Sequence, residues 1–331
     1  MEAIQYFETR STDPAYNLAF EEHILTHFRQ GNLLILWQND NAVIIGRNQN
    51  TAEEINQQFV NDHGIRVIRR NTGGGAVYHD LGNLNYSFIA DAEGIDQAAT
   101  QLFLSPVVNA LKTLGLDARF SGRNDILVSD RKISGTAQQL CKGRLLLHGT
   151  LLFDSDPDMI SGALNPDPTK FQSKSVKSVR SRVGNIRQFL KEDMDIRSFW
   201  HYLKTQLAGS SIIRPVLSDA DLAAVQKLKQ DKYDTWDWNY GRSPKFEIQN
   251  KKRWPGGLLD IRMTVSGGKI TLIKIYGDFL ALESIEPLEQ ALTGCAFHKD
   301  ALTESLASIC LPQYIGAITK DELIQTLLGD N

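Results

Sequence analysis

The hydrophobic residues in the first half of the chain are grouped in short runs, and Asn, Asp or Gly separates one run from the next. Runs of this kind, bounded by residues that favour turns, are typical of β-strands. Helical patterns lie at irregular intervals among them, which favours an α+β fold over a doubly wound parallel sheet. We therefore predict strands over Leu33–Trp37, Ala42–Gly46, Val67–Ile68, Leu84–Ile89, Ile126–Val128 and Leu145–Phe153.

Three helices are predicted in the first two thirds of the chain. The first begins at Asp13-Pro14, because Asp caps exposed amide groups and Pro at the first helical position loses no hydrogen bond. The second covers about residues 97–114 and contains Pro106, so we expect a kink or a restart there. The third helix is predicted over Asp195–Ala208, and a long loop or edge segment over Ser173–Asn185.

The last quarter of the chain has a different pattern. From Leu259 to Val265 apolar and polar residues alternate, as in a strand with one buried face. A second run, Ile270–Tyr276, follows after Ser-Gly-Gly-Lys, which is a hairpin signal. Three helical stretches come next, and Thr319 with Glu322 gives the last one the spacing of a capping box. We place a boundary near residues 242–252, with a larger domain at 1–246 and a small α+β domain at 252–331.

Composition and charge narrow the class of protein. The 331 residues are 42% hydrophobic and 23% charged, and the net charge is −3, which gives no long-range attraction to nucleic acid or an anionic membrane. We find neither a secretory signal nor an apolar run long enough to span a membrane. Three widely spaced cysteines exclude a disulfide scaffold and a cysteine-based zinc site, and they fit a reducing compartment. We therefore expect a soluble, cytoplasmic protein.

The segment from Arg69 to Asp80 carries the strongest chemical signal. It reads Arg-Arg-Asn-Thr-Gly-Gly-Gly-Ala-Val-Tyr-His-Asp and lies between two predicted strands. Successive glycines let the backbone approach a ligand and turn its N–H groups toward negative charge. The two arginines offer forked donors for phosphate or carboxylate. A flexible turn is the alternative, and the flanking Arg-Arg and His-Asp pairs make it the weaker one, so we predict a site for a nucleotide phosphate.

Familiar phosphate loops do not account for this segment. The Gly268-Lys269 pair has Met263 where a Walker loop needs its first glycine. The Gly-x-Gly-x-x-Gly pattern of dinucleotide-binding folds, with its following helix, is absent from the sequence.

A second polar cluster lies at residues 122–137. Lys132 lies two residues before a predicted Ser-Gly turn, from which its ammonium can reach a small carboxylate or an α-phosphate, although composition alone favours a surface lysine beside a turn. Asn124 and Asp125 offer the hard oxygen ligands that magnesium prefers. Further along, His148 lies inside an apolar strand, where a histidine is more often a hydrogen-bonded core residue than a catalyst.

Together these motifs resemble those of the lipoate–protein ligase A family. They occur in the same order, at compatible spacing, and cover nearly the whole chain. The matching segments are Arg-Arg-x-x-Gly-Gly-Gly-x-Val-x-His-Asp-x-Gly-Asn from Arg69, Gly-Arg-Asn-Asp at 122–125, Lys-x-Ser-Gly-x-Ala at 132–137, His-Gly-Thr-Leu-Leu from His148, Ser-Val-Arg-Ser-Arg-Val at 178–183 and Trp-x-Trp-x-Tyr-Gly from Trp236.

The resemblance implies a fold and an activity. The larger domain would have mixed and antiparallel sheets with packed helices, similar to the catalytic fold of biotin ligases, and a small accessory domain would follow it. Lipoate and Mg-ATP would give lipoyl-AMP, and the lipoyl group would pass to one lysine of a lipoyl-carrier domain. The acceptors implied are 2-oxoacid dehydrogenase subunits, the glycine-cleavage H protein or both, and the role is salvage of free lipoate.

The resemblance also implies roles for particular residues. Lys132 would be the catalytic residue, in contact with both the lipoate carboxylate and the adenylate phosphate, and His79 and His148 would lie beside lipoate. Asp125 and Asn124 are the expected magnesium ligands, and the group that assists the acceptor lysine stays open among His79, Asp125 and His148. The implied ATP and adenylate site comprises Arg70, Gly75, Ala76, Val77, Tyr78 and Lys132.

Two other functions remain as alternatives. The first is an ATP-independent transferase that moves lipoyl or octanoyl groups between carrier proteins, for which Cys141 would be the nucleophile, although no base flanks it. The second is a regulator that binds the adenylate without transferring it. No DNA-binding helix–turn–helix precedes the motifs, which weakens the second alternative.

Overall fold

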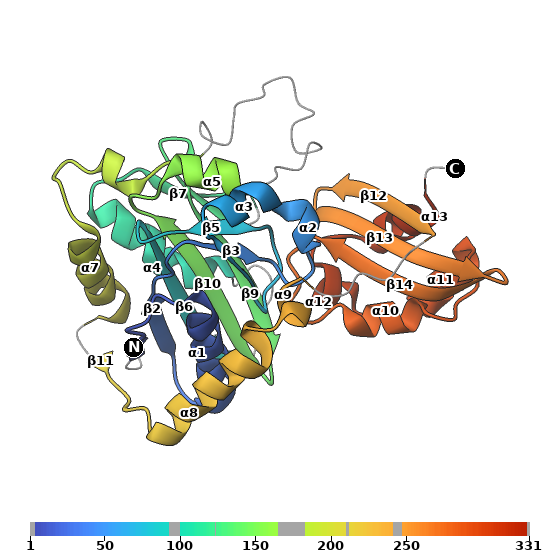
Figure 1. The fold of residues 1–331 in the computed structure, drawn as a ribbon, viewed down its shortest axis with the longest axis horizontal. Coiled ribbons are helices and arrows are strands. Elements are labelled where there is room, and N and C mark those ends of the chain that lie inside the picture. Colours follow the sequence, from blue (N-terminus) through green and yellow to red (C-terminus); the bar gives the residue numbers. More distant parts are fainter. Residues whose placement is uncertain are drawn as a thin grey trace.

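The computed structural model describes residues 4–92, 100–122, 124–164, 183–209, 212–240 and 247–329. Figure 1 shows a larger body, built from the residues up to 240, beside a smaller one that begins at residue 247. Each body combines sheets with helices, so the predicted α+β class is confirmed. Because residues 241–246 lie outside the described part, the domain limits at 246 and 252 stay a prediction.

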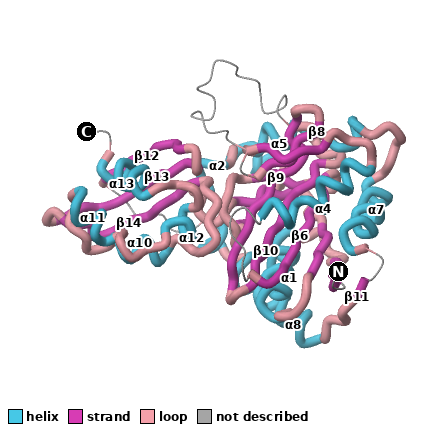
Figure 2. The backbone as a smooth tube through the Cα atoms, turned by 180° about the vertical axis from the view of Figure 1, so that it is seen from behind, coloured by secondary structure: helices cyan, strands magenta, loops and turns pink. Residues whose placement is uncertain are grey.

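The larger body is organised around an eight-stranded sheet. Its strands are β1 (Ile4–Glu8), β2 (Leu33–Trp37), β6 (Asn83–Asp91), β7 (Ala118–Ser121), β8 (Asp125–Val128), β9 (Arg131–Cys141), β10 (Arg144–Leu152) and β11 (Ile212–Ile213). They lie in the order β11-β1-β2-β6-β10-β9-β8-β7, with parallel pairs on either side of β1 and antiparallel pairs from β2 to β7. From behind, β6, β10 and β9 run side by side through this body (Figure 2). The sheet includes four of the six predicted strands.

A smaller sheet faces this one and carries the other two predicted strands. It consists of β3 (Ala42–Ile45), β4 (Arg66–Arg69) and β5 (Val77–His79), and β3 lies in the middle. Two short helices, α2 (Thr51–Glu54) and α3 (Gln57–Asp62), connect β3 to β4. The glycine-rich segment therefore connects β4 to β5, the two edge strands of this sheet.

Helices cover both faces of the large sheet (Figure 1). Those of the larger body are α1 (Pro14–His27), α4 (Thr100–Thr113), α5 (Pro157–Ala163), the 3-10 helix η3 (Ile186–Phe189), α7 (Ile196–Ala208), α8 (Asp219–Leu228), the π-helical turn η4 (Lys229–Tyr233) and α9 (Trp236–Asn239). Successive residues of a strand point to opposite faces. Accordingly, Leu34 and Leu36 of β2 join a core with α4 and α7, whereas Leu33 and Ile35 join a core with α1.

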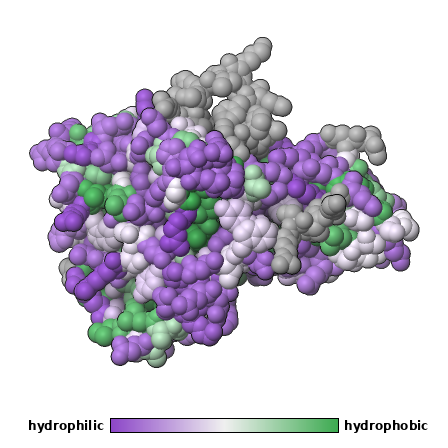
Figure 3. Space-filling view, viewed as in Figure 1, coloured by the Kyte–Doolittle hydropathy of each residue, from purple (hydrophilic) through white to green (hydrophobic). Residues whose placement is uncertain are grey.

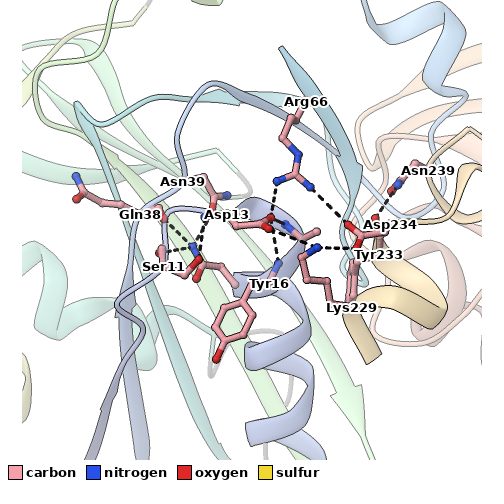
Figure 4. Close-up of polar contacts among 12 residues, drawn as sticks. Ser11, Asp13, Tyr16, Gln38, Asn39, Arg66, Lys229, Tyr233, Asp234 and Asn239 are labelled. Carbon is pink, nitrogen blue, oxygen red and sulfur yellow. Dashed lines mark hydrogen bonds and ion pairs between the residues drawn. The ribbon is translucent and has the colours of Figure 1, made fainter. Parts of the chain in front are cut away.

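The N-terminus of α1 is fixed by Asp13, as predicted. Its carboxylate accepts from the backbone N–H groups of Ala15 and Tyr16, which have no partner within the helix. The same carboxylate pairs with Arg66 of β4 at 2.6 Å and with Lys229 of η4 at 3.5 Å (Figure 4). One helix cap thus joins three elements that lie far apart in the sequence.

The other helix predictions met different outcomes. The helix predicted over residues 195–208 is confirmed as α7, and Asp195 caps it. α4 continues through Pro106 as a single helix, so no restart occurs there. Its apolar residues pack into a large core. The free energy gained from this packing outweighs the loss of the one backbone hydrogen bond that proline removes, so the helix continues. Most of the predicted loop at 173–185 lies outside the described residues.

The smaller body is an antiparallel sheet packed on helices. β12 (Ile248–Trp254), β13 (Gly257–Ser266) and β14 (Lys269–Gly277) form the sheet, and the predicted hairpin between the last two is confirmed. In its turn Gly267 and Gly268 have φ values of 58° and 72°, which favour glycine. Four helices follow where three were predicted: α10 (Glu286–Leu292), α11 (Lys299–Ser305), α12 (Leu311–Ile315) and α13 (Lys320–Leu328), the last with the predicted capping box.

The face of the molecule drawn in Figure 3 is mostly polar. Figure 3 shows one face on which hydrophobic residues form separate small patches among hydrophilic ones. Within the described residues, none of the helices has both the length and the apolar character that crossing a membrane requires.

Candidate active site

A cavity of about 440 Å³ lies where the two sheets of the larger body meet the smaller body. Its floor is a row of residues on adjacent strands of the large sheet, in which Asn85 lies between Trp37 and Thr150. Its opposite wall includes Ile44 of β3 and the glycine-rich segment. The predicted residues Arg70, Gly75, Ala76, Val77, His79, Asn124, Asp125, Lys132 and His148 all line it.

Arg70 holds the glycine-rich loop in shape. Its guanidinium donates to Thr72 Oγ1, to the carbonyl of Ile44 and to the carbonyls of Gly73 and Gly75, at 2.6–3.1 Å. Four of the five N–H groups of an arginine are thereby used within the protein. Burial lowers the pKa of Arg70 to about 10, so it stays charged at neutral pH. Arg70 therefore organises the loop around a positive charge.

Arg69 has a different role from the phosphate contact that the sequence suggested. Its guanidinium donates to the carbonyls of Gly46, Arg47 and Gln49 and to Thr51 Oγ1. Burial lowers its pKa to about 10. Arg69 is absent from the described lining of the main cavity, and it anchors the segment between β3 and α2.

His148 is both a buried hydrogen-bonded residue and part of the cavity wall. Its Nδ1 lies 2.9 Å from a carboxylate oxygen of Glu21 on α1, and its Nε2 lies 2.8 Å from Thr72 Oγ1. Thr72 also accepts from Arg70, so a continuous chain joins α1 to the glycine-rich loop. Glu21 was not among the predicted site residues, and its place on the buried face of the predicted first helix was the available signal.

His79 is held as a neutral imidazole. The ring is 3% exposed and lies edge-on to Trp37, with ring centroids 6.4 Å apart. The pKa of His79 is lowered to about 3, chiefly by burial and further by electrostatic repulsion from Arg70 and His148. Such a weak base is poorly suited to remove a proton from the acceptor lysine.

Lys132 and Asp125 form an ion pair at one end of the cavity floor. Lys132 Nζ lies 2.7 Å from Asp125 Oδ1, and both side chains are about one-third exposed. A two-residue turn brings β8 and β9 together, and Ser129 and Asp130 both have the positive φ values of a hairpin turn of this type. The predicted turn after Lys132 is wrong, because residues 131–141 form a strand with a register shift opposite Ile126 and Leu127.

Gly135 makes room for the Lys132 side chain. A Cβ atom on Gly135 would lie 3.1 Å from Lys132 Nζ, which is closer than a normal contact. Beside it, Asn124 lines the cavity and donates its amide to the carbonyl of Thr136 at 2.8 Å. Among the described residues there is no group of three or more His, Cys, Asp or Glu side chains placed to share a metal ion.

Tyr78 is the predicted site residue whose side chain is absent from the described cavity lining. Tyr78 and Val77 are neighbours on β5, so their side chains point to opposite faces of the sheet and pack into different cores. The Tyr78 hydroxyl donates to Asn41 Oδ1 at 3.0 Å. Any contact of Tyr78 with a ligand in this cavity would be through its backbone.

The smaller body supplies part of the cavity wall, which sequence reasoning missed. Arg253, Asp278 and Leu280 line the cavity, and Arg253 lies 3.2 Å from Asp278. The N–H of Gly74 donates to the carbonyl of Phe279 at 3.3 Å, so this segment packs directly on the glycine-rich loop. Cys141, the nucleophile of the transferase alternative, is free but is not part of the described lining.

Comparison with known proteins gives a consistent result along the whole chain. Residues 13–208 match the lipoyl protein ligase A/B catalytic domain, and residues 243–327 match the bacterial lipoate protein ligase C-terminus. A lipoate-protein ligase of Bacillus subtilis, LplJ, is 42% identical over 320 residues, which cover 95% of this chain and 97% of the relative. Lipoate–protein ligase 1 of Staphylococcus aureus is also 42% identical, with 96% of this chain and 97% of the relative covered.

Solved structures agree. LipL1 of P. falciparum, in complex with lipoate, superposes with a TM-score of 0.81 at 25% identity, over 98% of this chain and 99% of that one. A lipoate-protein ligase A bound with ATP gives 0.63 at 31% identity, over 73% of this chain and 99% of that one. The chain therefore belongs to the lipoate–protein ligase family, and it is an enzyme of ATP-dependent lipoate ligation.

Proposed function

We propose that this cavity converts lipoate and ATP into lipoyl-AMP and pyrophosphate, and then passes the lipoyl group to a lysine of a carrier domain. The observation that carries the proposal is the position of Lys132. Its ammonium lies at one end of the cavity floor, and the same cavity is walled by the glycine-rich loop. A carboxylate and an α-phosphate placed there would meet the same positive charge.

The first step needs positive charge because it joins two anions. A carboxylate oxygen of lipoate attacks the α-phosphorus, a new O–P bond forms, and the bond to the bridging oxygen breaks as pyrophosphate leaves with the electron pair. Lys132 offsets the repulsion between carboxylate and phosphate. Arg70 contributes indirectly, because its guanidinium binds the carbonyls of Gly73 and Gly75 and so holds the loop in place around the phosphates. Backbone N–H groups of the loop supply further donors.

The second step acylates a lysine. A free lysine has a pKa of about 10.4, so the amine must lose a proton before it attacks the carbonyl carbon of lipoyl-AMP. The C–N bond forms, the bond from the carbonyl carbon to the phosphate oxygen breaks, and AMP leaves. Asp125 and His148 line the cavity and are the better candidates for the proton acceptor, since the pKa of His79 is about 3.

Magnesium fits the oxygen-bearing side chains beside Lys132. Asp125 and Asn124 would hold it together with the phosphates of ATP, because Mg²⁺ is commonly bound by one or two carboxylates plus substrate phosphates. When bound, it neutralises phosphate charge. The role of these two residues is part of the proposal.

The acceptors that we propose are the lipoyl-carrier domains of 2-oxoacid dehydrogenase subunits, the glycine-cleavage H protein, or both. A structure of the bi-partite lipoate protein ligase of the archaeon Thermoplasma acidophilum is 32% identical to this chain, and its description names an E2 lipoyl domain as belonging to that ligase. We place the reaction in the cytoplasm, where the free cysteines would stay reduced.

Replacement of Lys132 tests the proposal. Lys132→Ala should lower lipoate-dependent exchange of pyrophosphate into ATP by at least about 100-fold, since loss of one electrostatic contact to a developing charge costs this much. Lys112→Ala is the matched control, because Lys112 is exposed on α4 and is absent from the described cavity lining. Near-native exchange in Lys132→Ala would remove Lys132 from the mechanism.

A further inference from the structure

The strand that carries Lys132 contains one extra residue. Ile126 and Leu127 are consecutive on β8, and their partners on β9 are Ser134 and Lys132. The residue between these two partners, Ile133, is therefore the extra residue of a β-bulge. Side chains of a regular strand alternate between the two faces of a sheet, and an extra residue shifts this alternation. The bulge thus determines the face of the sheet on which Lys132 lies.

The bulge turns Lys132 toward the cavity. Gly135 lines the cavity, and the closeness of its Cβ position to Lys132 Nζ shows that both residues occupy the same face of β9. In an uninterrupted strand, residues three apart point to opposite faces. Ile133 and Ser134 are instead both fully buried, and Ile133 packs in the core with α4 and α7. Without the extra residue, the Lys132 side chain would start from the face that packs on this core.

The bulged end of β9 receives little support from the neighbouring strands. Its pairing with β10 ends at Thr136 and Gly149, before the bulge is reached. The bulge itself interrupts the pairing with β8. The ion pair between Lys132 and Asp125 adds little, because both side chains are partly exposed and such pairs are weak in water. A stable position for Lys132 therefore needs a further contact to the backbone of this part of β9.

Three consecutive residues, Val183-Gly184-Asn185, supply this contact, and we call them the clamp. Val183 forms a parallel bridge with Lys132, and the N–H of Gly184 donates to the carbonyl of Lys132 at 2.9 Å. The side chain of Asn185 accepts from the N–H of Ser155 at 3.0 Å and donates to the carbonyl of Ser155 at 2.8 Å. The clamp therefore ties the bulged end of β9 to the chain that follows β10.

We propose that the clamp positions Lys132 for the reaction, so that Gly184 and Asn185 are positioning residues. The inference deepens the proposed function and rests on it. By holding the carbonyl of Lys132, the clamp fixes the backbone from which the ammonium extends over the cavity floor. Gly184 is buried, and a Cβ atom there would lie 2.9 Å from Arg131 Cβ. A larger residue at this position must displace either the clamp or Arg131, which directly precedes Lys132.

Gly184→Ala tests the clamp, alone and combined with Lys132→Ala. Alone, it should lower kcat/KM for lipoyl-AMP formation by about 10- to 100-fold, because a shift of about 1 Å in a reacting group has an effect of this order. In the Lys132→Ala background it should change the residual rate by less than about twofold, because the lysine that the clamp positions is absent. Equal losses in both backgrounds, or a wild-type rate in Gly184→Ala alone, would overturn the inference.

Gly162→Ala is the matched control for overpacking. A Cβ atom on Gly162 would lie 2.4 Å from the ring of Phe59, but this glycine is on α5 and absent from the described cavity lining, so the folded variant should keep its rate.

Asn185→Ala decides the question if Gly184→Ala does not fold. Asn185 is only partly buried, so its replacement should leave the fold intact. This variant should lower the rate only where Lys132 is present, and a loss in both backgrounds or in neither would refute the clamp. A folded wild-type protein that makes no lipoyl-AMP would instead refute the proposed function, and the inference with it.

Discussion

Several side chains at the site act on other side chains as much as on a ligand. Arg70 was predicted to bind ATP, yet most of its donors bind the carbonyls of the loop that surrounds the cavity. His148 joins Glu21 to Thr72, and Thr72 is in turn bonded to Arg70. Loss of one of these residues would therefore disturb the shape of the loop as well as a contact to substrate.

The protonation of His79 gives a prediction about stability. An unfolded histidine has a pKa near 6.5, whereas the folded pKa of His79 is about 3, so between these values the unfolded state binds one more proton. The free energy of unfolding should therefore fall as the pH drops from about 6.5 toward 3, by up to about 1.4 kcal/mol per pH unit. Urea titrations at pH 5 to 7 would show a shallower fall for His79→Gln than for wild type. Parallel curves would contradict the assignment.

Sequence reasoning found the residues that belong to recognisable motifs and missed those that act singly. Lys132, Asp125 and His79 stood in runs of unusual composition, and all three line the cavity. Glu21 and Asn85 are ordinary polar residues on a helix and a strand, and their partners lie far away in the sequence. The position of Glu21 on the buried face of the first helix was a weak signal, and the local pattern gave none for Asn85, because the roles of both residues depend on how the elements pack.

At the level of elements, hydrophobic spacing predicted most strands and helices but not their pairing. The predicted strand at 33–37 lies between a parallel and an antiparallel neighbour, and both neighbours come from distant parts of the chain. The helix did not restart at Pro106, since one lost hydrogen bond weighs less than a buried helix face. Local sequence does not contain this tertiary contribution.

The glycine-rich loop between β4 and β5 gives a prediction at this scale. A Cβ atom on Gly73 would lie 2.7 Å from the carbonyl oxygen of Phe279, too close for contact without movement. Gly73→Ala should therefore destabilise the protein by about 1–3 kcal/mol, as overpacking does. Gly75→Ala is the matched control for stability, because a Cβ there would meet nothing within 4 Å. Equal melting temperatures for the two variants would show that the loop and this segment are not packed together.

At the scale of the whole molecule, the cavity is completed by residues from both bodies. Arg253, Asp278 and Leu280 come from the part of the chain after residue 247. Three backbone hydrogen bonds, donated by Gly74, Leu140 and Gly277, join the two bodies. The sequence indicated a separate C-terminal unit but gave no sign that it contributes to the site. Contacts between distant segments become visible only in the folded chain.

The central claim is that this cavity makes lipoyl-AMP before any acceptor is involved. The most direct measurement is mass spectrometry of the purified protein mixed with lipoate and Mg-ATP, without a carrier domain. Lipoyl-AMP and pyrophosphate should form in this mixture, and the lipoyl-AMP signal should disappear when a lipoyl-carrier domain is added. A folded protein that yields no lipoyl-AMP, but lipoylates a carrier from a lipoylated donor protein, would contradict this claim.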